Sequence, residues 1–348
     1  MFRHLREMAS ARISLEMPPN IDPSRATLAY GRLALPRLNR ELKDDLLLIR
    51  QRAVKALCDY LHDHEHIAAA VHEGIIPSLK RLLRDKDVPV RAMAAECFIV
   101  FNQHAIGRKA FIDEDVLDVL KLLFSSYEPD IVRLNAHKAV ELLSINPAHC
   151  QAIVDADLIP LLIACVEREY AEIKAVILDT LNRCLDLNSD AGLNAGGMQV
   201  FTKLLSHHSP EVRGKSAQVI LMLTVNPRGR QQAIDKETIP ALVGLLNDNN
   251  PDVKASAAGA LAFTSVTTHG RYTAINADAI PNLLRLLVHS CSRVRVNGLK
   301  AITCIAEAPE GRRILLDHID HIKKLTEDVD AGVRKHANIA VDVITWKP

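Results

Sequence analysis

The chain has 348 residues, of which 48% are hydrophobic and 4% are aromatic, and 43 basic against 42 acidic residues leave a net charge of +1. The length exceeds one ordinary hydrophobic core, so it favours two domains or an elongated array of repeats, and the composition favours the array. A disordered or collagen-like chain is excluded, and the balanced charge provides no global field that would attract nucleic acid or anionic lipid.

The first 25 residues are predicted to form a flexible tail ahead of the folded part. Its arginines and serines are faintly like those of a mitochondrial presequence, but Glu7 and Glu16 argue against one, and the unbroken apolar run of a secretory signal is missing. Elsewhere no apolar run approaches the roughly 18 to 20 residues of a membrane span. The seven cysteines form no C-x-x-C pair, and several lie among leucines and alanines, so we expect reduced thiols in a cytosolic-type compartment.

From residue 26 onward, a short apolar segment with proline or an equivalent residue near its start recurs eight times. Examples are IIPSLKRLL in the second copy and TIPALVGLL in the sixth. The eight anchor residues are Pro36, Pro77, Asp118, Pro160, Gln199, Pro240, Pro281 and Asp320. They lie 39 to 42 positions apart, a period that indicates a repeat architecture.

A second ladder follows the anchors in fixed phase. In each copy a basic residue, preceded by an aliphatic one, lies 14 or 15 positions after the anchor. These residues are Arg50, Arg91, Arg133, Lys174, Arg213, Lys254, Arg295 and Arg334. Because two ladders keep the same phase in all eight copies, we expect one repeat array over residues 26–348.

Each copy predicts three helices. The anchor segment has apolar residues at helical spacing, and its proline suits a first helical turn, where the missing N–H has no partner in any case. A longer helix starts near the basic residue, and small residues such as Ala94 and Ala258 would let neighbouring copies approach closely. A shorter helix lies before each anchor segment, after a break marked by glycines such as Gly107 and Gly229. In the Gly-rich linker NSDAGLNAGG we expect this short helix to be frayed or missing.

A period near 41 residues with three helices per copy resembles the armadillo-repeat family, from about residue 26 to residue 348. The resemblance implies an all-α fold, an armadillo/HEAT-like right-handed superhelical solenoid of about eight three-helix repeats. The stretches PSRATLAYGRLALPRLN, AAGALAFTSVTTHGRYTAINADAI, AEAPEGRRILL and VITWKP are also similar to the armadillo-repeat subunits of ciliary radial spokes. This narrower resemblance implies a structural protein of the cilium or flagellum axoneme, a part of the cytoskeleton.

Sequence signatures of catalysis are not found. The patterns G-x-x-x-x-G-K-[ST], G-x-G-x-x-G and G-x-S-x-G do not occur, so neither a nucleotide-binding loop nor a nucleophile elbow is predicted. The closest approach to a metal site is the group His62, His64, Glu65, His66, His72 and Glu73. Helical-repeat iron hydroxylases hold metal with His-Glu dyads, but both dyads here belong to one linker and its short helix, so a solvated polar segment is the preferred interpretation. We expect no catalytic residues, no cofactor and no metal.

The remaining histidines have structural interpretations. His207 and His208 lie in a turn before Pro210 and have no Cys or carboxylate at metal spacing nearby. His137 takes the place of a small or apolar residue in its copy, and we expect it to be a hydrogen-bonded core residue.

A partner-binding groove is predicted on the third helices, which line the concave face in the armadillo architecture. Positions five and nine after the basic residue lie on one helical side, and peptide-binding relatives carry Trp at the fifth and Asn at the ninth. No ninth position here is Asn, so we expect no binding of a nuclear-localisation peptide. The predicted groove residues are Val100, Leu142, Lys138, Arg183, Met222, Phe263 and Lys300.

An apolar groove fringed by charges of both signs suits the apolar face of a helix better than an extended basic peptide. The alternative, that these side chains complete the core between repeats, stays open. We therefore expect a non-enzymatic scaffold, monomeric within a larger hetero-complex, that binds helical segments of other radial spoke subunits and supports control of axonemal motility. No nucleic acid or membrane partner is expected. A cytosolic adaptor for protein complexes and a helical-repeat metal hydroxylase are the alternatives.

Overall fold

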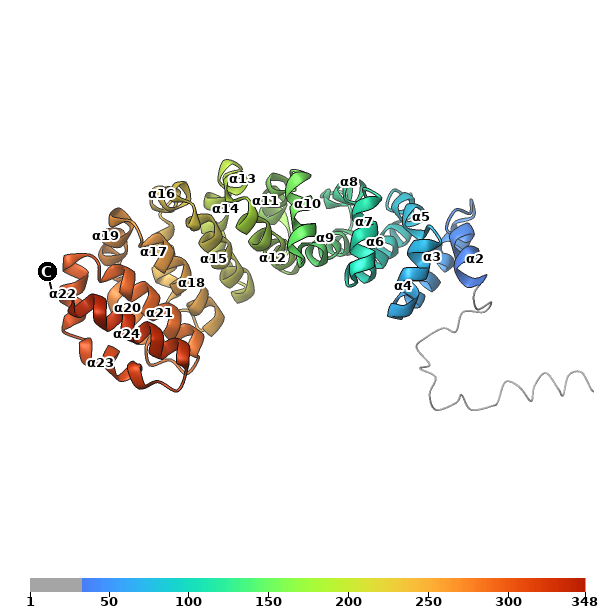
Figure 1. Ribbon diagram of the computed structural model, residues 1–348. Helices are drawn as coiled ribbons and strands as arrows, with labels where there is room; N and C mark the ends of the chain where they lie inside the picture. Colours follow the sequence, from blue (N-terminus) through green and yellow to red (C-terminus); the bar gives the residue numbers. More distant parts are fainter. Residues whose placement is uncertain (1–32, 348) are drawn as a thin grey trace, which may run out of the picture. The chain divides into compact units, whose positions relative to one another are not determined.

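The computed structural model describes residues 33–347, and every regular element in that range is a helix (Figure 1). The tail predicted over residues 1–25 lies outside the described residues. The chain divides into two compact units, one ending at Leu123 and the other beginning at Phe124.

Twenty-three α-helices lie in the described residues, as two short helices followed by a long one in each repeat after the first, of which a second and a third helix are described, so the predicted all-α fold of HEAT/armadillo type is confirmed. The first helices are α4 (His64–His72), α7 (Ala105–Asp113), α10 (Pro147–Asp155), α13 (Ser189–Asn194), α16 (Pro227–Asp235), α19 (Thr268–Asn276) and α22 (Pro309–Leu316). The second helices are α2 (Ala34–Glu41), α5 (Ile75–Leu82), α8 (Leu117–Leu120), α11 (Leu158–Arg168), α14 (Gly197–Leu204), α17 (Thr238–Leu245), α20 (Ala279–Leu286) and α23 (Ile319–Lys324). The third helices are α3 (Leu47–Leu61), α6 (Val88–Asn102), α9 (Asp130–Ser144), α12 (Ala171–Leu187), α15 (Pro210–Val225), α18 (Pro251–Thr264), α21 (Ser292–Ile305) and α24 (Ala331–Thr345).

Two of the second helices are extended by a tighter turn. The 3₁₀ helix η2 (Lys121–Phe124) follows α8, and the 3₁₀ helix η3 (Leu325–Glu327) follows α23. Both belong to repeats whose anchor residue is an aspartate, Asp118 or Asp320, where most copies have proline.

The linker NSDAGLNAGG holds α13, so the expectation of a frayed or missing helix there is wrong. Asn188 caps this helix, since its side-chain oxygen accepts a hydrogen bond from the backbone N–H of Ala191 at 3.0 Å. The helix is short because seven residues separate Asn188 from Gly196, against ten between Asn146 and Asp157 in the preceding repeat.

A residue with left-handed backbone conformation precedes six of the second helices and turns the chain sharply out of the first helix. Two of the six are Gly74 and Gly196, with φ of 73° and 75°. The other four are Asp115, Asp157, Glu237 and Asp278. A side chain makes this conformation less favourable by roughly 1 to 2 kcal/mol, so the surrounding structure holds these four turns against local strain.

The third helices pack on one another in sequence order within each unit: α3 on α6 in the first, and α9, α12, α15, α18, α21 and α24 in the second (Figure 1). Small side chains fill these contacts, as the sequence predicts. Ala258 and Ala260 of α18 are fully buried, and a Cβ placed on Gly259 would lie 3.3 Å from Asn297 Nδ2 of α21. A larger side chain would overpack the contact, which typically costs about 1 to 3 kcal/mol.

The basic ladder ties each third helix to the turn before it. Arg213 Nη1 donates hydrogen bonds to the carbonyl oxygens of His207 and His208, at 2.8 and 2.9 Å. The same two bonds, to carbonyls five and six residues back, are made by Arg50, Arg91, Arg295 and Arg334. These carbonyls follow the end of the second helix and have no partner inside it, so the basic residue supplies the missing donors.

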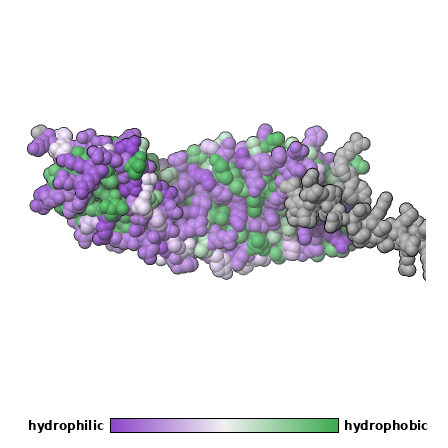
Figure 2. All heavy atoms as spheres, turned by 90° about the horizontal axis from the view of Figure 1, so that it is seen from below, coloured by the Kyte–Doolittle hydropathy of each residue, from purple (hydrophilic) through white to green (hydrophobic). Residues whose placement is uncertain are grey.

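Hydrophobic residues at the surface form small patches among hydrophilic ones on the face that Figure 2 shows. Among the described helices, none alone combines the length and the apolar character of a membrane span. The helices α10 and α11 meet those criteria when they are taken together, across a bend of 88°. All seven cysteines lie in the described range and carry free thiols.

Candidate functional site

Four residues of the predicted groove lie at the same position on successive third helices of the second unit. They are Leu142 on α9, Arg183 on α12, Met222 on α15 and Phe263 on α18. The first three are half-buried, whereas 38% of Phe263 is exposed. Because these helices pack in order, their side chains form a row that solvent reaches.

A second apolar row, which we did not predict from the sequence, lies beside the first at the ends of the third helices. It consists of Ile145, Val225 and Val266, each three positions after a residue of the first row and each exposed. Residues three apart share one side of a helix. We use the name third-helix surface for the apolar residues of both rows, Leu142, Ile145, Met222, Val225, Phe263 and Val266. The sequence holds a signal for the second row, since the twelfth position after the basic residue is aliphatic in these three repeats.

The surface becomes polar at α12. Arg183 Nη1 lies 2.7 Å from Glu141 Oε1 and 3.0 Å from Ser144 Oγ, so the guanidinium is held against α9. A cavity of about 320 Å³ opens beside it. The cavity is lined by Ser144, Ile145, Pro147, Cys150, Asn182, Arg183, Asp186, Leu187 and Met222. The structure thus brings two predicted groove residues, Arg183 and Met222, to one cavity.

Two thiols meet at this cavity, where Cys150 Sγ in its wall lies 3.4 Å from Cys184 Sγ. The pKa of Cys150 is lowered, because its hydrogen bond with the thiol of Cys184 and the nearby charge of Arg183 together outweigh the effect of burial. The same hydrogen bond, and then burial, raise the pKa of Cys184. Cys150 is therefore the more readily ionised thiol of the pair.

Val100 requires a correction. It lies on α6 in the first unit, and only 3% of it is exposed. The neighbouring residues Cys97, Phe98, Phe101 and Asn102 are buried too, so the end of α6 is covered on nearly every side. Val100 therefore completes the core between repeats and is left out of the candidate surface.

The two predicted lysines occupy the fifth position of their helices. Lys138 Nζ lies 3.3 Å from Glu172 Oε1 of the next repeat, and both side chains are substantially exposed, so this ion pair contributes at most about 1 kcal/mol. Lys300 is half-buried on α21. Burial, and then the charges of Lys300 and Lys335, lower the pKa of His336. Neither lysine lies in the wall of the cavity beside Arg183.

Two of the histidines around α4 contact the backbone or a ring of the protein itself. His62 Nδ1 lies 2.8 Å from the carbonyl oxygen of Cys58. The ring of His66 stacks on Tyr60 with 3.6 Å between centroids, and its Nδ1 lies 2.9 Å from the Tyr60 carbonyl oxygen. Between residues 33 and 347, no group of three or more His, Cys, Asp or Glu residues has a geometry that could hold a metal ion.

His137 is a core residue, as predicted, but the expected hydrogen bond is absent. Only 1% of it is exposed, its ring stacks on Phe124 with 4.0 Å between centroids, and neither ring nitrogen has a hydrogen-bond partner in the described residues. Burial, followed by the charges of Arg168 and Arg133, lowers the pKa of His137 to about 3. Stacking against an apolar ring thus takes the place of the predicted hydrogen bond.

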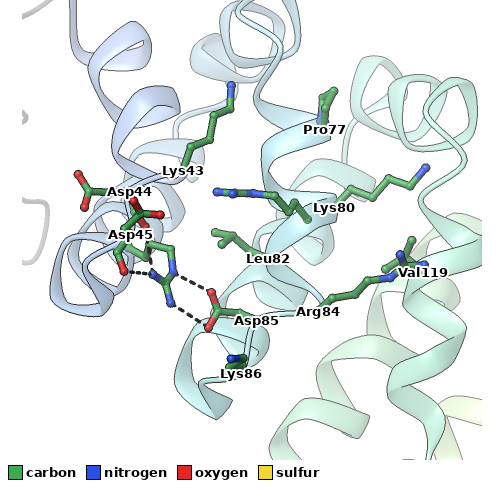
Figure 3. A pocket seen from close by; sticks show the side chains of 12 residues that line it. Lys43, Asp44, Asp45, Pro77, Lys80, Leu82, Arg84, Asp85, Lys86 and Val119 are labelled. Carbon is green, nitrogen blue, oxygen red and sulfur yellow. Dashed lines mark hydrogen bonds and ion pairs between the residues drawn. The ribbon is translucent and has the colours of Figure 1, made fainter.

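A larger cavity, of about 710 Å³, lies in the first unit, and Figure 3 shows its wall. We call it the basic cavity, because its lining holds six basic and three acidic side chains together with three apolar ones. The lining residues are Lys43, Asp44, Asp45, Arg50, Pro77, Lys80, Arg81, Leu82, Arg84, Asp85, Lys86 and Val119. This cavity was not predicted from the sequence, because its charges are spread over two repeats and the net charge of the whole chain is +1.

Comparison with known proteins agrees with this architecture. A family model described as HEAT repeat matches residues 75–105, which hold α5 and α6. Among solved structures, the crystal structure of an engineered protein from a structural genomics consortium matches with a TM-score of 0.82 at 24% identity, over 89% of this chain and 78% of that one.

Two designed armadillo repeat proteins are also similar. One, solved in complex with the peptide (KR)4, has a TM-score of 0.59 at 20% identity, over 65% of this chain and 98% of its own. The other has a TM-score of 0.58 at 21% identity, with the same coverage. At these identities the likeness establishes the fold.

Proposed function

We propose that this chain, a helical repeat protein of the HEAT/armadillo type, is a non-enzymatic scaffold that binds a helical segment of another protein on its third-helix surface. The observation that carries the proposal is the exposure of apolar side chains at equivalent positions of α9, α15 and α18. Stacked helical repeats commonly present extended binding surfaces of this kind. One designed armadillo repeat protein of similar fold was solved with a bound peptide, which supports a binding role.

The apolar part is widest over α15 and α18. Met222 and Val225 lie on the first of these helices, and Phe263 and Val266 lie on or just beyond the end of the second. An amphipathic helix presents apolar residues three and four positions apart, and such a stripe suits a surface made of two short apolar rows. Phe263 is the anchor in this proposal, because aromatic side chains at interface centres often contribute about 2 kcal/mol or more.

We propose further that the partner is another subunit of the ciliary radial spoke, so that the chain belongs to the axoneme. The support is the likeness of several stretches to armadillo-repeat spoke subunits of the type called radial spoke head 14 homologue. One of these stretches covers residues 257–280 and includes Phe263 and Val266. The scaffold would then hold spoke subunits in place and support the control of motility. The alternative partner class is that of a cytosolic adaptor.

The test is affinity purification of the tagged full chain from ciliated cells, followed by mass spectrometry of the bound proteins. The wild type is compared with the double variant Phe263→Ala, Val266→Ala. The matched control is Val288→Ala with Val329→Ala, which removes exposed apolar side chains from two turns away from the third-helix surface.

We expect spoke subunits with the wild type and with the control pair, and their loss with the double variant. Recovery of trafficking or junction proteins in place of spoke subunits would contradict the assignment to the radial spoke. It would not contradict the binding role of the third-helix surface. Equal recovery by all three proteins would contradict the surface itself.

A further inference from the structure

We propose that the basic cavity of the first unit binds an acidic peptide segment of a partner protein. The inference goes beyond the proposed function, which concerns a different surface on the second unit. Six basic and three acidic side chains line the cavity, and the protein itself neutralises only some of these charges.

One pair of charges in the cavity is matched. Arg50 Nε lies 2.7 Å from Asp85 Oδ2, and Arg50 Nη1 donates to the carbonyls of Asp44 and Asp45. Burial alone would raise the pKa of Asp85, but the hydrogen bonds from Arg50 and from the backbone N–H of Asp87 outweigh it and lower the pKa. Arg50 and Asp85 are therefore both charged and compensate each other.

Two more cations are hydrogen-bonded without being neutralised. Lys80 Nζ donates to the carbonyl oxygen of Glu114 at 2.6 Å, and Arg81 Nη2 donates to the carbonyl oxygen of Leu42 at 2.8 Å. A carbonyl accepts the hydrogen bond but carries no net charge, so both positive charges persist. These bonds fix the two side chains, which reduces the entropy that a partner would lose in ordering them.

Three cations in the cavity wall have no partner among the described residues. The side chains of Lys43, Arg84 and Lys86 are exposed and make no hydrogen bond or ion pair with any described residue. Figure 3 shows Lys43 on the first repeat and Arg84 and Lys86 on the second, so the unpaired cations come from two repeats. After the matched pair is set aside, five cations face two carboxylates.

The mixed lining favours an acidic peptide over a denser polyanion. The carboxylates of Asp44 and Asp45 would repel closely spaced phosphates, but they can accept hydrogen bonds from peptide N–H groups. Pro77, which is exposed, adds apolar surface for a side chain that lies between acidic ones. The net charge of +1 gives no long-range attraction to nucleic acid.

The experiment is a fluorescence anisotropy titration of a labelled acidic octapeptide, (DE)4, with the full chain at low ionic strength. The test variant is Lys43→Glu, Arg84→Glu, Lys86→Glu. The control variant, Lys323→Glu, Lys324→Glu, Lys335→Glu, makes the same change of net charge on exposed residues of the second unit. Circular dichroism melting verifies that all three proteins are folded, and the basic peptide (KR)4 and a thymidine octanucleotide are titrated in parallel.

We expect saturable binding of (DE)4 that is weakened at least about tenfold in the test variant, retained in the control variant, and reduced by added salt. Absence of saturable binding, or equal weakening in both variants, would overturn the proposal. Tighter binding of the octanucleotide or of (KR)4 than of (DE)4 would overturn the assignment of an acidic peptide. None of these outcomes depends on the third-helix surface.

Discussion

Arg213 and Asp248 form an ion pair between two successive repeats, with Arg213 Nε 2.7 Å from Asp248 Oδ2. The same guanidinium holds the turn before its own helix, so one side chain fixes both its own repeat and the next. The aspartate side chain is only 6% exposed. The same arrangement joins Arg50 to Asp85, Arg133 to Glu169 and Arg295 to Asp328.

Two other junctions in the second unit have different residues at these two positions. Lys174 takes the place of the arginine and His207 takes the place of the aspartate, and Lys254 and His289 repeat the exchange. His207 Nδ1 still accepts the turn hydrogen bond, from the backbone N–H of Ser209 at 3.1 Å. Burial, and then nearby positive charges including Lys174, lower the pKa of His207, so the imidazole stays neutral and attracts no lysine. In the second unit, junctions with this buried arginine–carboxylate pair thus alternate with junctions that have a lysine and a histidine at the same positions.

The first prediction concerns this ion pair. Asp248→His keeps an acceptor for the turn and removes the charge, which leaves Arg213 without its partner. We expect the free energy of unfolding to fall by about 1 to 3 kcal/mol, measured by urea titration with circular dichroism. As a control, Asp252→His removes an exposed carboxylate that is paired with Arg293. This variant should change the free energy of unfolding by at most about 1 kcal/mol. Equal losses in the two variants would contradict the role of the buried pair.

The second prediction concerns the pH dependence of His137. Its pKa is about 3 in the folded protein, against 6.5 for an ordinary histidine, so between these values the unfolded chain binds a proton that the folded protein does not. Stability is therefore lost as the pH falls from 6.5 toward 3, by up to about 1.4 kcal/mol per pH unit from this residue. His137→Leu should remove this part of the loss. Parallel pH profiles of unfolding free energy for the wild type and the variant would contradict this role of His137.

Much of the fold follows from the sequence because its cause is local and repeated. The anchor proline marks the second helix in most copies, and the basic residue marks the third helix because it must hydrogen-bond the preceding turn. The short helix after Asn188 escaped prediction, because a single capping amide was enough to start a helix in a Gly-rich segment. Glycine content alone did not reveal the cap.

The candidate site is less predictable, because exposure depends on neighbours and not on the residue itself. Val100 and Leu142 occupy the same position in their repeats, yet Val100 is enclosed by buried residues of its own helix end and Leu142 is half-buried. The basic cavity was missed for a related reason. Lys43 and Lys86 belong to different repeats, and only the fold brings them to one cavity.

The third prediction concerns the left-handed turns. Glu237 is exposed with φ of 55°, and Glu237→Gly relieves the strain of its side chain, so we expect an increase in unfolding free energy of up to about 1 kcal/mol. The converse change, Gly74→Ala, has open space around the new Cβ but introduces the same strain, and should lower the unfolding free energy by about 1 kcal/mol. Chemical denaturation measures both, and a shift of the same sign in the two variants would contradict the explanation.

The fourth prediction separates folding from binding at Phe263. Since 38% of this side chain is exposed, Phe263→Ala should lose less than the roughly 3 to 5 kcal/mol of a fully buried phenylalanine. We expect a melting temperature close to that of the wild type together with lost partner capture. A large melting drop would show that the ring belongs to the core. Normal melting with full capture would remove Phe263 from the interface.

The most direct measurement for the third-helix surface is site-specific photo-crosslinking in ciliated cells. Phe263→benzoylphenylalanine places the crosslinker at the centre of the surface, and Val288→benzoylphenylalanine places it on an exposed turn of the same unit. The account predicts that the variant at residue 263 crosslinks to a helical segment of a radial spoke subunit and that the variant at residue 288 does not. Crosslinking at residue 288 but not at residue 263, or none at either position, would contradict it.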